Sequence, residues 1–425
     1  MSTLDSIAVV QSDRAPNGFQ LTFTTPRTPS EVADFNVLVA AQLQSGQRII
    51  ITASVGTSMQ VLMDGIITRV QMDPPGAQSE ARISVIGEDI SVMMDMHEYS
   101  LEYPYMPDSV IAETILGEWG SLGITPEVTF SASDAISLFY IYQQVGTDRA
   151  YLNQLAAQNA YVFCIRPGPV VGQSRGYWGP PLRTETPQPV LTVDSSGFGS
   201  VISLSASFDS TAPTMIYGLV QDTLTGLPLP AMAIASTRPG TLAAYPQLSD
   251  DPSISGLLSG ALSAGLGAVS AIGSAVGGVV SLVSSSAGSA ISSGVNAVTS
   301  GIGDITGVSP SNSFAMQPLR LFDHQGLNIL QAEARAQALL NASTDQVVTL
   351  TGRLDALRYG SILIAPGVVG LRGAGNRFDG YYYVQKVTHS ISRGAYIQEF
   401  AMAREGLGST IATVPLTQVT AGGTP

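Results

Sequence analysis

The sequence has little charge and almost none of the residues that build disulfides or zinc sites. Charged residues occupy 12% of its 425 positions, about half the share of an ordinary soluble protein. Cys164 is the only cysteine, which excludes an intrachain disulfide and a cysteine-rich zinc site. A surface so poor in charge consists largely of Ser, Thr, Gln and Gly, and such surfaces often lie against other subunits. The composition therefore favours a protein that works inside a large assembly.

Positive charge is especially scarce. Lysine and arginine total 19 against 32 acidic residues, which gives a net charge of −13, and Lys386 is the sole lysine. A nucleic-acid-binding surface needs clustered cations that displace counterions from phosphate groups, so the acidic balance argues against one. The stretch Met1–Ser12 has no basic segment followed by an apolar run. We therefore expect no signal peptide and synthesis in the cytoplasm.

The sequence contains no recognisable catalytic motif. The three histidines, His97, His324 and His389, are far apart, and none lies in an HExxH pattern. His389 falls in a predicted strand, where we expect a half-exposed structural residue. Cys164 lies in an apolar run, where a thiol is usually inert packing. We predict no enzyme, no cofactor and no metal site.

Two pairs of adjacent carboxylates are the remaining candidates for acid–base chemistry. They are Glu88–Asp89 and Asp250–Asp251. A glycosidase needs two carboxyl groups that face each other across a cleft, and adjacency in the sequence gives no sign of this. We expect both pairs to be turn and loop charges.

Residues 1–95 have the pattern of β-strands joined by turns. Gly65 lies within a strand run and suggests a bulge, where extra twist helps a sheet to curl. A capping-box pattern at Thr28–Glu31 predicts a short helix. We interpret the region as a small tube-like β-barrel with one helix. Its predicted strands are Gln47–Val55, Val61–Val70 and Ala81–Ile86.

Residues 96–199 change to an α/β pattern. Apolar residues at helical spacing predict helices over Ser109–Gly120 and Thr147–Asn159. A strand at Tyr161–Ile165 follows. Residues 166–190 are rich in proline and glycine, so we expect them to form a long surface loop.

The strand pattern returns at about residue 200, which predicts a second tube-like β-barrel with one helix. We assign 200–235 and 314–407 to this domain, 236–313 to an insertion, and 408–425 to a C-terminal tail. The predicted helix is Gln325–Asn341. The predicted strands are Val201–Phe208, Thr214–Val220, Gln346–Leu354, Ser361–Ala365, Gly380–Ser390 and Tyr396–Arg404.

The centre of the insertion, Pro252–Gly303, is unusual because none of its 52 residues is charged. It contains 14 Ser, 11 Gly, 8 Ala and 16 Val, Ile or Leu. Large apolar residues recur every three or four positions from Leu258 to Val283, which favours helices that small residues would let pack closely. Serine and glycine oppose this because both are weak helix formers. Three interpretations stay open: a linker or lumen-filling segment, packed glycine-rich helices, and a membrane-inserting segment.

Three stretches resemble, in order, the baseplate hub family of contractile tails. This family includes phage tail hubs, late-control D proteins and the N-terminal part of type VI secretion spike proteins. The first stretch is Leu62–Thr68 with Ile83–Ser91, the second is Tyr142–Phe163, and the third is Asp379–Phe400. The positions that match the family's motifs, called here the signature positions, are Gly65, Gly87, Asp89, Thr147, Asp148, Leu152, Leu155, Gly380, Tyr382, Val384, His389, Tyr396 and Phe400.

The resemblance implies a mainly β, α+β fold. Two tube-like β-barrel domains with one helix each would be separated by an α/β domain, and three chains would form a pseudo-sixfold homotrimer. Such a hub adapts the hexameric inner tail tube to a trimeric spike and lines the delivery channel. Nothing after residue 407 resembles a spike β-helix or a lysozyme domain, so we expect the piercing tip to be another chain.

The implied partners are further copies of the chain, the inner tail tube protein, the spike protein and other baseplate proteins. A tape-measure protein in the lumen is a further candidate, and we expect no sequence-specific nucleic acid. Assembly would occur in the host cytoplasm, and the final location would be a virion baseplate or an extracellular injection particle. The alternative hypothesis is a membrane-active pore-forming protein that acts through 252–303, a segment that could also bring a hub into contact with the target membrane.

Overall fold

A computed structural model gives the protein a mainly β, α+β fold, as predicted. The predicted helix at Thr28–Glu31, His324, the Asp250–Asp251 pair and the whole of 252–303 lie outside the residues that the structure describes. The described residues are 3–25, 43–56, 58–73, 81–131, 141–168, 170–193, 199–221, 228–247, 318–322, 327 and 329–410.

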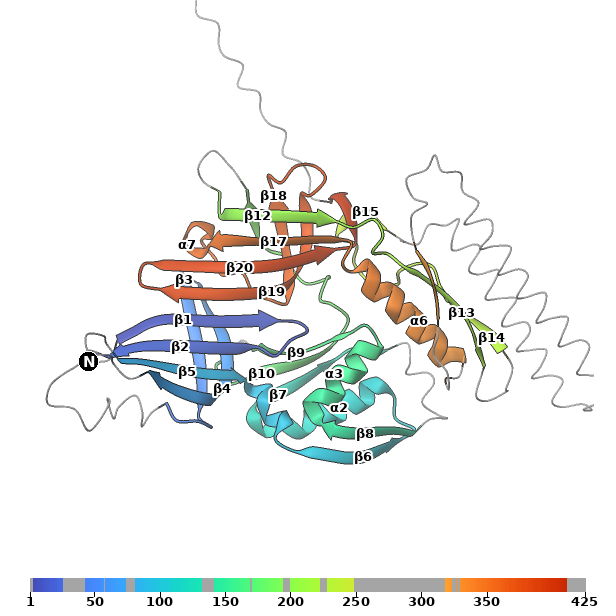
Figure 1. The fold of residues 1–425 in the computed structure, drawn as a ribbon, viewed down its shortest axis with the longest axis horizontal. Coiled ribbons are helices and arrows are strands. Elements are labelled where there is room, and N and C mark those ends of the chain that lie inside the picture. The colour runs from blue at the N-terminus through green and yellow to red at the C-terminus, as the bar shows by residue number, and fades with distance from the viewer. Residues whose placement is uncertain are drawn as a thin grey trace, which may run out of the picture.

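An 11-stranded sheet dominates the fold (Figure 1). Its N-terminal strands are β1 (Thr3–Ser12), β2 (Gly18–Thr25), β3 (Arg48–Val55), β4 (Ser58–Asp73) and β5 (Ala81–Asp89). Its later strands are β11 (Gln188–Thr192), β12 (Val201–Phe208), β17 (Val348–Asp355), β18 (Gly367–Arg372), β19 (Gly380–Ser392) and β20 (Ala395–Arg404).

One five-strand arrangement occurs twice in this sheet. In the first unit, β1 pairs with β2, β2 with β5, β5 with β4, and β4 with β3. In the second unit, β12 pairs with β17, β17 with β20, β20 with β19, and β19 with β18. Every pairing is antiparallel, and both units use the same order along the chain and across the sheet. The pairings therefore describe an internal repeat that runs head to tail.

The irregularities of the two units match as well. One register shift leaves Asp5 unpaired against β2, and an equivalent shift leaves Ile202 unpaired against β17. A second shift leaves Thr68 unpaired against β5, and its equivalent leaves Gln385 unpaired against β20. Bulges are retained features of a fold rather than accidents, so their coincidence supports the repeat. The bulge predicted at Gly65 lies instead at Thr68.

The two units are joined edge to edge by β1 and β19, whose pairing we call the seam. It runs from Ser6 opposite Ser392 to Ser12 opposite Lys386. One hydrophobic core extends behind both units, from Val9 on β1 to Met402 on β20. The pairings among the described residues close neither unit into a barrel. The strand order of the sheet runs from β12 to β3.

The middle segment contains the two helices predicted there, α2 (Asp108–Glu118) and α3 (Asp148–Gln158). Both helices contribute to a core around the fully buried Trp178. Its other elements are η1 (Ile90–Asp95), η2 (Trp119–Leu122), β6 (Glu98–Pro104), β7 (Ile124–Val128), β8 (Ile141–Thr147), β9 (Val162–Pro167) and β10 (Ser174–Gly179).

The loop predicted over 166–190 is wrong, because this stretch holds β10 and the start of β11. Strand β10 pairs with β7 on one side and with β9 on the other, and β11 pairs with β18. The glycines that suggested turns serve close packing instead. A Cβ on Gly176 would lie 2.8 Å from the Leu116 side chain, and one on Gly179 would lie 2.7 Å from the Tyr177 hydroxyl.

The second unit has a layer of its own beside the large sheet. Helix α6 (Ile329–Thr344), predicted as Gln325–Asn341, packs on β13 (Met215–Gln221) and β14 (Pro228–Ala233). Strand β16 (Leu319–Leu321) pairs with β13. Helix α7 (Ala356–Tyr359) follows β17. No helix in the described ranges is both long and apolar enough to span a membrane.

The beginning of the predicted insertion folds with the second unit. Strand β15 (Ala243–Pro246) pairs with β21 (Gly406–Ser409). The buried Arg238 donates to Asp345 at 2.9 Å, and Arg183 donates to the same carboxylate at 2.7 Å. Burying charged groups requires such pairing. Residues 236–247 therefore belong to the packed part of the chain, whereas the sequence placed them in the insertion.

Two signature glycines make room for one aromatic ring in the first unit. Gly65 and Gly87 lie on neighbouring strands beside the Phe19 ring, and Gly87 is directly opposite Phe19 across the β2–β5 pair. A Cβ on Gly87 would collide with both the Phe19 ring and the Ile66 carbonyl oxygen. The glycine at this place is therefore a packing requirement.

We expect Gly87→Ala to destabilise the fold by about 1–3 kcal/mol or more, because overpacking here meets backbone as well as a side chain. Gly117→Ala is the matched control. It lies near the end of α2 with nothing within 4 Å of an added Cβ, so it should be neutral or should stabilise by about 0.5–1 kcal/mol. Urea unfolding of both variants measures the difference, and equal effects would contradict the packing argument.

Candidate assembly site: the seam and its surroundings

The seam contains a buried polar cluster centred on His389. The Nδ1 atom of His389 lies 2.9 Å from the Tyr396 hydroxyl and 3.0 Å from Nε2 of Gln398, while its Nε2 lies 3.2 Å from Oε1 of Gln11. The Gln11 oxygen can only accept, so it assigns the ring proton to Nε2. Burial lowers the pKa of His389 to about 3, which keeps the ring neutral. The expectation of a half-exposed histidine is wrong, because this side chain is fully buried.

Glutamine side chains in the same layer replace a strand. Gln398 donates to the Leu363 carbonyl at 2.8 Å and accepts from its amide at 3.1 Å, and Gln188 makes the same two bonds to Ile364 at 2.9 Å each. Gln11 accepts from the Ala365 amide at 3.2 Å. The prediction of a strand over Ser361–Ala365 is therefore wrong. Its backbone N–H and C=O groups form hydrogen bonds with glutamine side chains in place of a neighbouring strand, so these buried polar groups still have partners.

Asp89 connects the first unit to the middle segment. It caps η1 by accepting from the Ser91 amide at 2.9 Å, and it also accepts from the Asn17 amide at 3.3 Å. Burial raises the pKa of Asp89, and the bonds from Ser91 oppose this rise. Its neighbour Glu88 forms an ion pair with Arg149 at 2.9 Å. The expectation of simple turn charges is therefore wrong for this pair.

Thr147 and Asp148 organise the start of α3. Thr147 caps the helix by accepting from the Ala150 amide at 3.2 Å. Asp148 is buried and accepts from Nε1 of Trp119 at 3.0 Å and from Nε2 of Gln144 at 2.8 Å. Leu152 and Leu155, one and two turns further on, lie in the core of the middle segment. This motif fixes the position of a helix, and the Thr147 hydroxyl also donates to the Asp95 carboxylate at 2.7 Å.

The remaining signature positions pack the closing hairpin β19–β20. Gly380 has φ of 130°, and a Cβ there would lie 2.6 Å from the Arg404 guanidinium. This guanidinium stacks 4.3 Å from the centre of the Tyr382 ring. Val384 and Phe400 are buried in the shared core. The structure therefore places the third motif around a buried arginine and the seam.

Cys164 and Asp13 are buried titratable groups near the seam. Burial raises the pKa of the Cys164 thiol far above its usual value, which agrees with an inert packing role. Burial also raises the pKa of Asp13 to about 6, although Arg14 and a 3.1 Å hydrogen bond from the Tyr383 hydroxyl oppose the rise. Of the other histidines, His97 is exposed. The described part of the chain has no cluster of three or more His, Cys, Asp or Glu residues fit for a metal ion.

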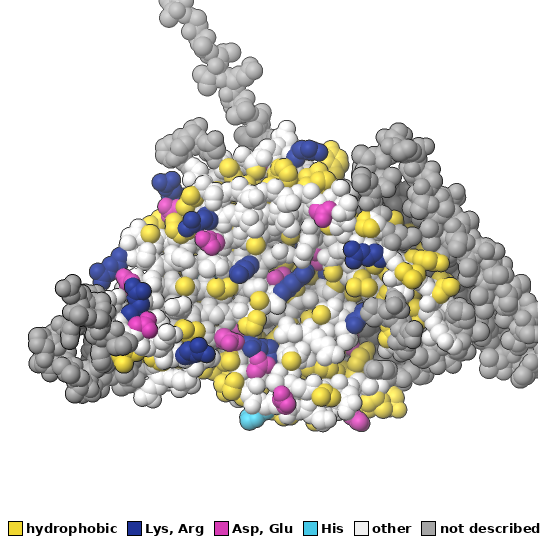
Figure 2. Space-filling model, viewed as in Figure 1, with side chains coloured by type: hydrophobic (Ala, Val, Ile, Leu, Met, Phe, Trp, Pro, Cys, Tyr) yellow, Lys and Arg dark blue, Asp and Glu magenta, His cyan; other side chains and the backbone are white. Residues whose placement is uncertain are grey.

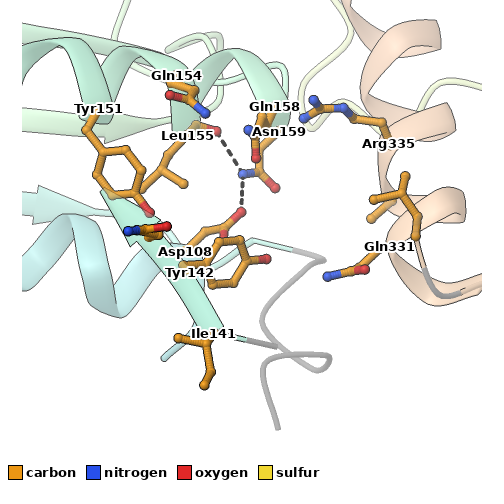
Figure 3. Close-up of a pocket in the computed structure, with 13 residues that line it drawn as sticks. Asp108, Ile141, Tyr142, Tyr151, Gln154, Leu155, Gln158, Asn159, Gln331 and Arg335 are labelled. Carbon is orange, nitrogen blue, oxygen red and sulfur yellow. Dashed lines mark hydrogen bonds between the residues drawn. The ribbon is translucent and has the colours of Figure 1, made fainter. Parts of the chain in front are cut away.

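A pocket of about 340 Å³ lies between the middle segment and α6 (Figure 3). Its lining is rich in amides, and Asn159 there donates to Asp108 at 2.7 Å. Arg335 extends from α6 on the opposite wall, and burial lowers its pKa. The described lining residues include no serine, cysteine or histidine that could pair as nucleophile and base. The amide, carboxylate and guanidinium groups of the lining suit the binding of polar groups.

Comparisons with known proteins identify tail proteins of the same fold. No family model and no curated protein matches this sequence. A tail protein from Neisseria meningitidis MC58 is 11% identical, with 96% of this chain and 93% of that one covered and a TM-score of 0.54. The 43 kDa tail protein of prophage MuSo2 from Shewanella oneidensis is 11% identical, with 95% of each chain covered and a TM-score of 0.56.

A third match is to a chain of a protein complex from Francisella. The half-lidded PdpA–VgrG complex of Francisella contains a chain 7% identical to this one, with a TM-score of 0.50. The match covers 96% of this chain and 55% of that one. The structural neighbours thus include tail proteins, as the sequence resemblance predicted, and the likeness extends over nearly the whole chain.

The raised pKa of Asp13 makes a pH-dependent prediction. Its pKa is about 6 when folded, against 3.8 for an ordinary aspartate, so Asp13 costs stability as the pH rises from about 4 to about 6. Asp13→Asn should therefore be as stable as the wild type near pH 4. Near pH 7.5 it should be more stable by about 1–3 kcal/mol. Urea unfolding across this range measures the difference.

His389→Gln should have the opposite effect on stability at neutral pH to that of Asp13→Asn. The folded-state pKa of His389 is lowered, so its contribution is present above about pH 6.5 and is lost as the pH falls toward 3. At neutral pH the wild type should be more stable than His389→Gln, and this difference in the free energy of unfolding should narrow as the pH falls. For Asp13→Asn the variant should be the more stable protein at neutral pH, and that difference should also narrow as the pH falls. A gap for either variant that is independent of pH would contradict these assignments.

Proposed function

We propose that the protein is a structural hub at the tip of a contractile tail or a related injection machine. Three copies would form a ring that joins a sixfold inner tube to a threefold spike. The observation that carries the proposal is the internal repeat: a single chain contains two five-strand units with the same chain order, pairings and bulges. Three such chains supply six similar ring segments.

The seam supports a ring rather than an independent pair of domains. The first strand of the first unit pairs with the fourth strand of the second unit, which is a head-to-tail contact. Head-to-tail contacts give closed rings when their rotation closes. A ring of three chains has threefold symmetry overall and nearly sixfold symmetry in its sheet, so it can face partners of both kinds.

The exposed face of the large sheet suits a channel wall. Along β1, β19 and β17 this face carries mostly small polar side chains, such as Ser6, Thr388, Ser390 and Thr351. Figure 2 shows this face with few charged side chains, and these are scattered. A surface with few charges and no large apolar patch offers little to which a passing cargo could adsorb.

The proteins with the same fold fit this role. Two are named as tail proteins, and their chains match this one along almost their full lengths. The inner tube protein, the spike and other baseplate proteins are the partners that the proposal requires. The pore-forming alternative has no support from a membrane-spanning helix among the described residues.

The proposal predicts the oligomeric state. The purified chain of 44.2 kDa should sediment at about three times this mass. Cryo-electron microscopy of the particle should show six similar sheet segments around a channel, with threefold symmetry in the outer parts. A chain that remains monomeric at high concentration and lies away from the axis of isolated tails would contradict the hub.

A further inference from the structure

The seam inside the chain has a counterpart at β12 and at the second half of β4, where no strand among the described residues takes the place of the seam partner. Counting from the equivalent bulges aligns the two units. Val9 and Ala206 each lie four residues after a bulge, at Asp5 and Ile202. Met72 and His389 likewise each lie four residues after a bulge, at Thr68 and Gln385. At the seam, Val9 lies opposite His389. The same geometry at the free ends would place Ala206 opposite Met72.

Equivalent positions differ sharply in burial. Val9 and His389 are 0% exposed at the seam, whereas Met72 is 47% exposed on β4 and Ala206 is exposed on β12. The position in the unit is the same in each case. The difference in exposure therefore follows from the neighbouring strand that is present at the seam and that no described residue supplies at β4 and β12.

The next pair of equivalent positions on the same face shows the same difference in burial. At the seam, Gln11 lies opposite Val387, and both are buried. Their equivalents are Phe208, which is 38% exposed, and Val70, which is 42% exposed. Large apolar side chains at edge positions favour aggregation unless a partner covers them.

Within the described ranges, no strand pairs with one edge of β4 from Arg69 to Asp73, where the pairing would occur. Strand β3 pairs with β4 up to Ile66, residues 45–47 bond to the β4 backbone at Ile67 and Thr68, and β5 occupies the other edge as far as Asp73. The seam shows the same division, because β18 pairs with β19 up to Val384 and β1 takes over from Lys386. In both units the third strand does not extend along the second half of the fourth strand, and at the seam β1 pairs there.

We propose that β12 of one copy pairs antiparallel with the free edge of β4 in the next copy, in the register of the seam. Ala206 then lies opposite Met72, and Phe208 lies opposite Val70. The partner is a second copy of this chain, because both edges belong to it and the seam already joins equivalent strands. This proposal rests on the proposed hub and assigns the contact between its subunits.

The side chains on both edges suit this register. Strand residues alternate between the two faces, so Ala206, Phe208, Val70 and Met72 share the face that is buried at the seam. Ser207 and Gln71 would meet on the opposite, polar face. The next position would bring Asp209 opposite Arg69, where the seam has Ser12 opposite Lys386. A shift by one residue would place the apolar side chains on the polar face.

Cysteine crosslinking tests the register in the full chain. In a Cys164→Ala background, Ala206→Cys with Met72→Cys should form disulfides between copies, because directly opposed residues lie within disulfide range. Non-reducing electrophoresis should show covalent dimers and trimers. The control is Ser205→Cys with Met72→Cys, whose side chains point to opposite faces, and its yield should be at least about tenfold lower.

Sedimentation of the same variants separates this proposal from the hub itself. Trimers that fail to crosslink through the in-register pair would overturn the register and leave the hub standing. Equal crosslinking by both cysteine pairs would also overturn it. Monomers that form no crosslink at any concentration would remove both the interface and the hub. Trimers linked mainly through the in-register pair would support both.

Discussion

The backbone pairing of β1 with β19 is the contact on which the rest of this architecture depends. Each five-strand unit has edges, and an unpaired edge leaves a row of N–H and C=O groups without partners. The seam pairs β1 with the half of β19 that β18 leaves free, and one continuous core lies behind the joined units. It also fixes the direction of the repeat, because it joins the first strand of one unit to the fourth strand of the other.

The buried polar cluster explains why this junction has one register. His389, Gln11 and Gln398 lie in the core, where a polar group without a partner costs about 1–3 kcal/mol. Their hydrogen bonds connect β1, β19, β20 and the segment 363–365. A one-residue slip of β1 would move Gln11 to the other face and leave several of these groups unsatisfied. Apolar packing alone would tolerate such a shift more easily.

The signature positions have structural roles throughout the molecule. Glycines make room for the Phe19 ring and the Arg404 guanidinium, and Thr147 and Asp89 cap helices. Asp148 and His389 make buried hydrogen bonds, and the remaining residues pack in or beside the cores. None of these roles needs a ligand, which suits the structural hub proposed above. The low charge of the sheet face fits the same proposal, because a channel wall of this kind would give its contents little to adhere to.

The sequence by itself determined the elements that depend on local periodicity. Helices α2 and α3 and strands β17, β19 and β20 follow from spacing and caps within about fifteen residues. Tertiary structure decided strand β10, in which glycine allows close packing. It also decided the conformation of 361–365, whose backbone bonds to glutamine side chains, and the full burial of His389. It also decided the seam, whose partners lie about 380 residues apart. No local pattern can specify such a pairing, because strands of similar composition compete for the same edge until bulges and buried polar groups select one register.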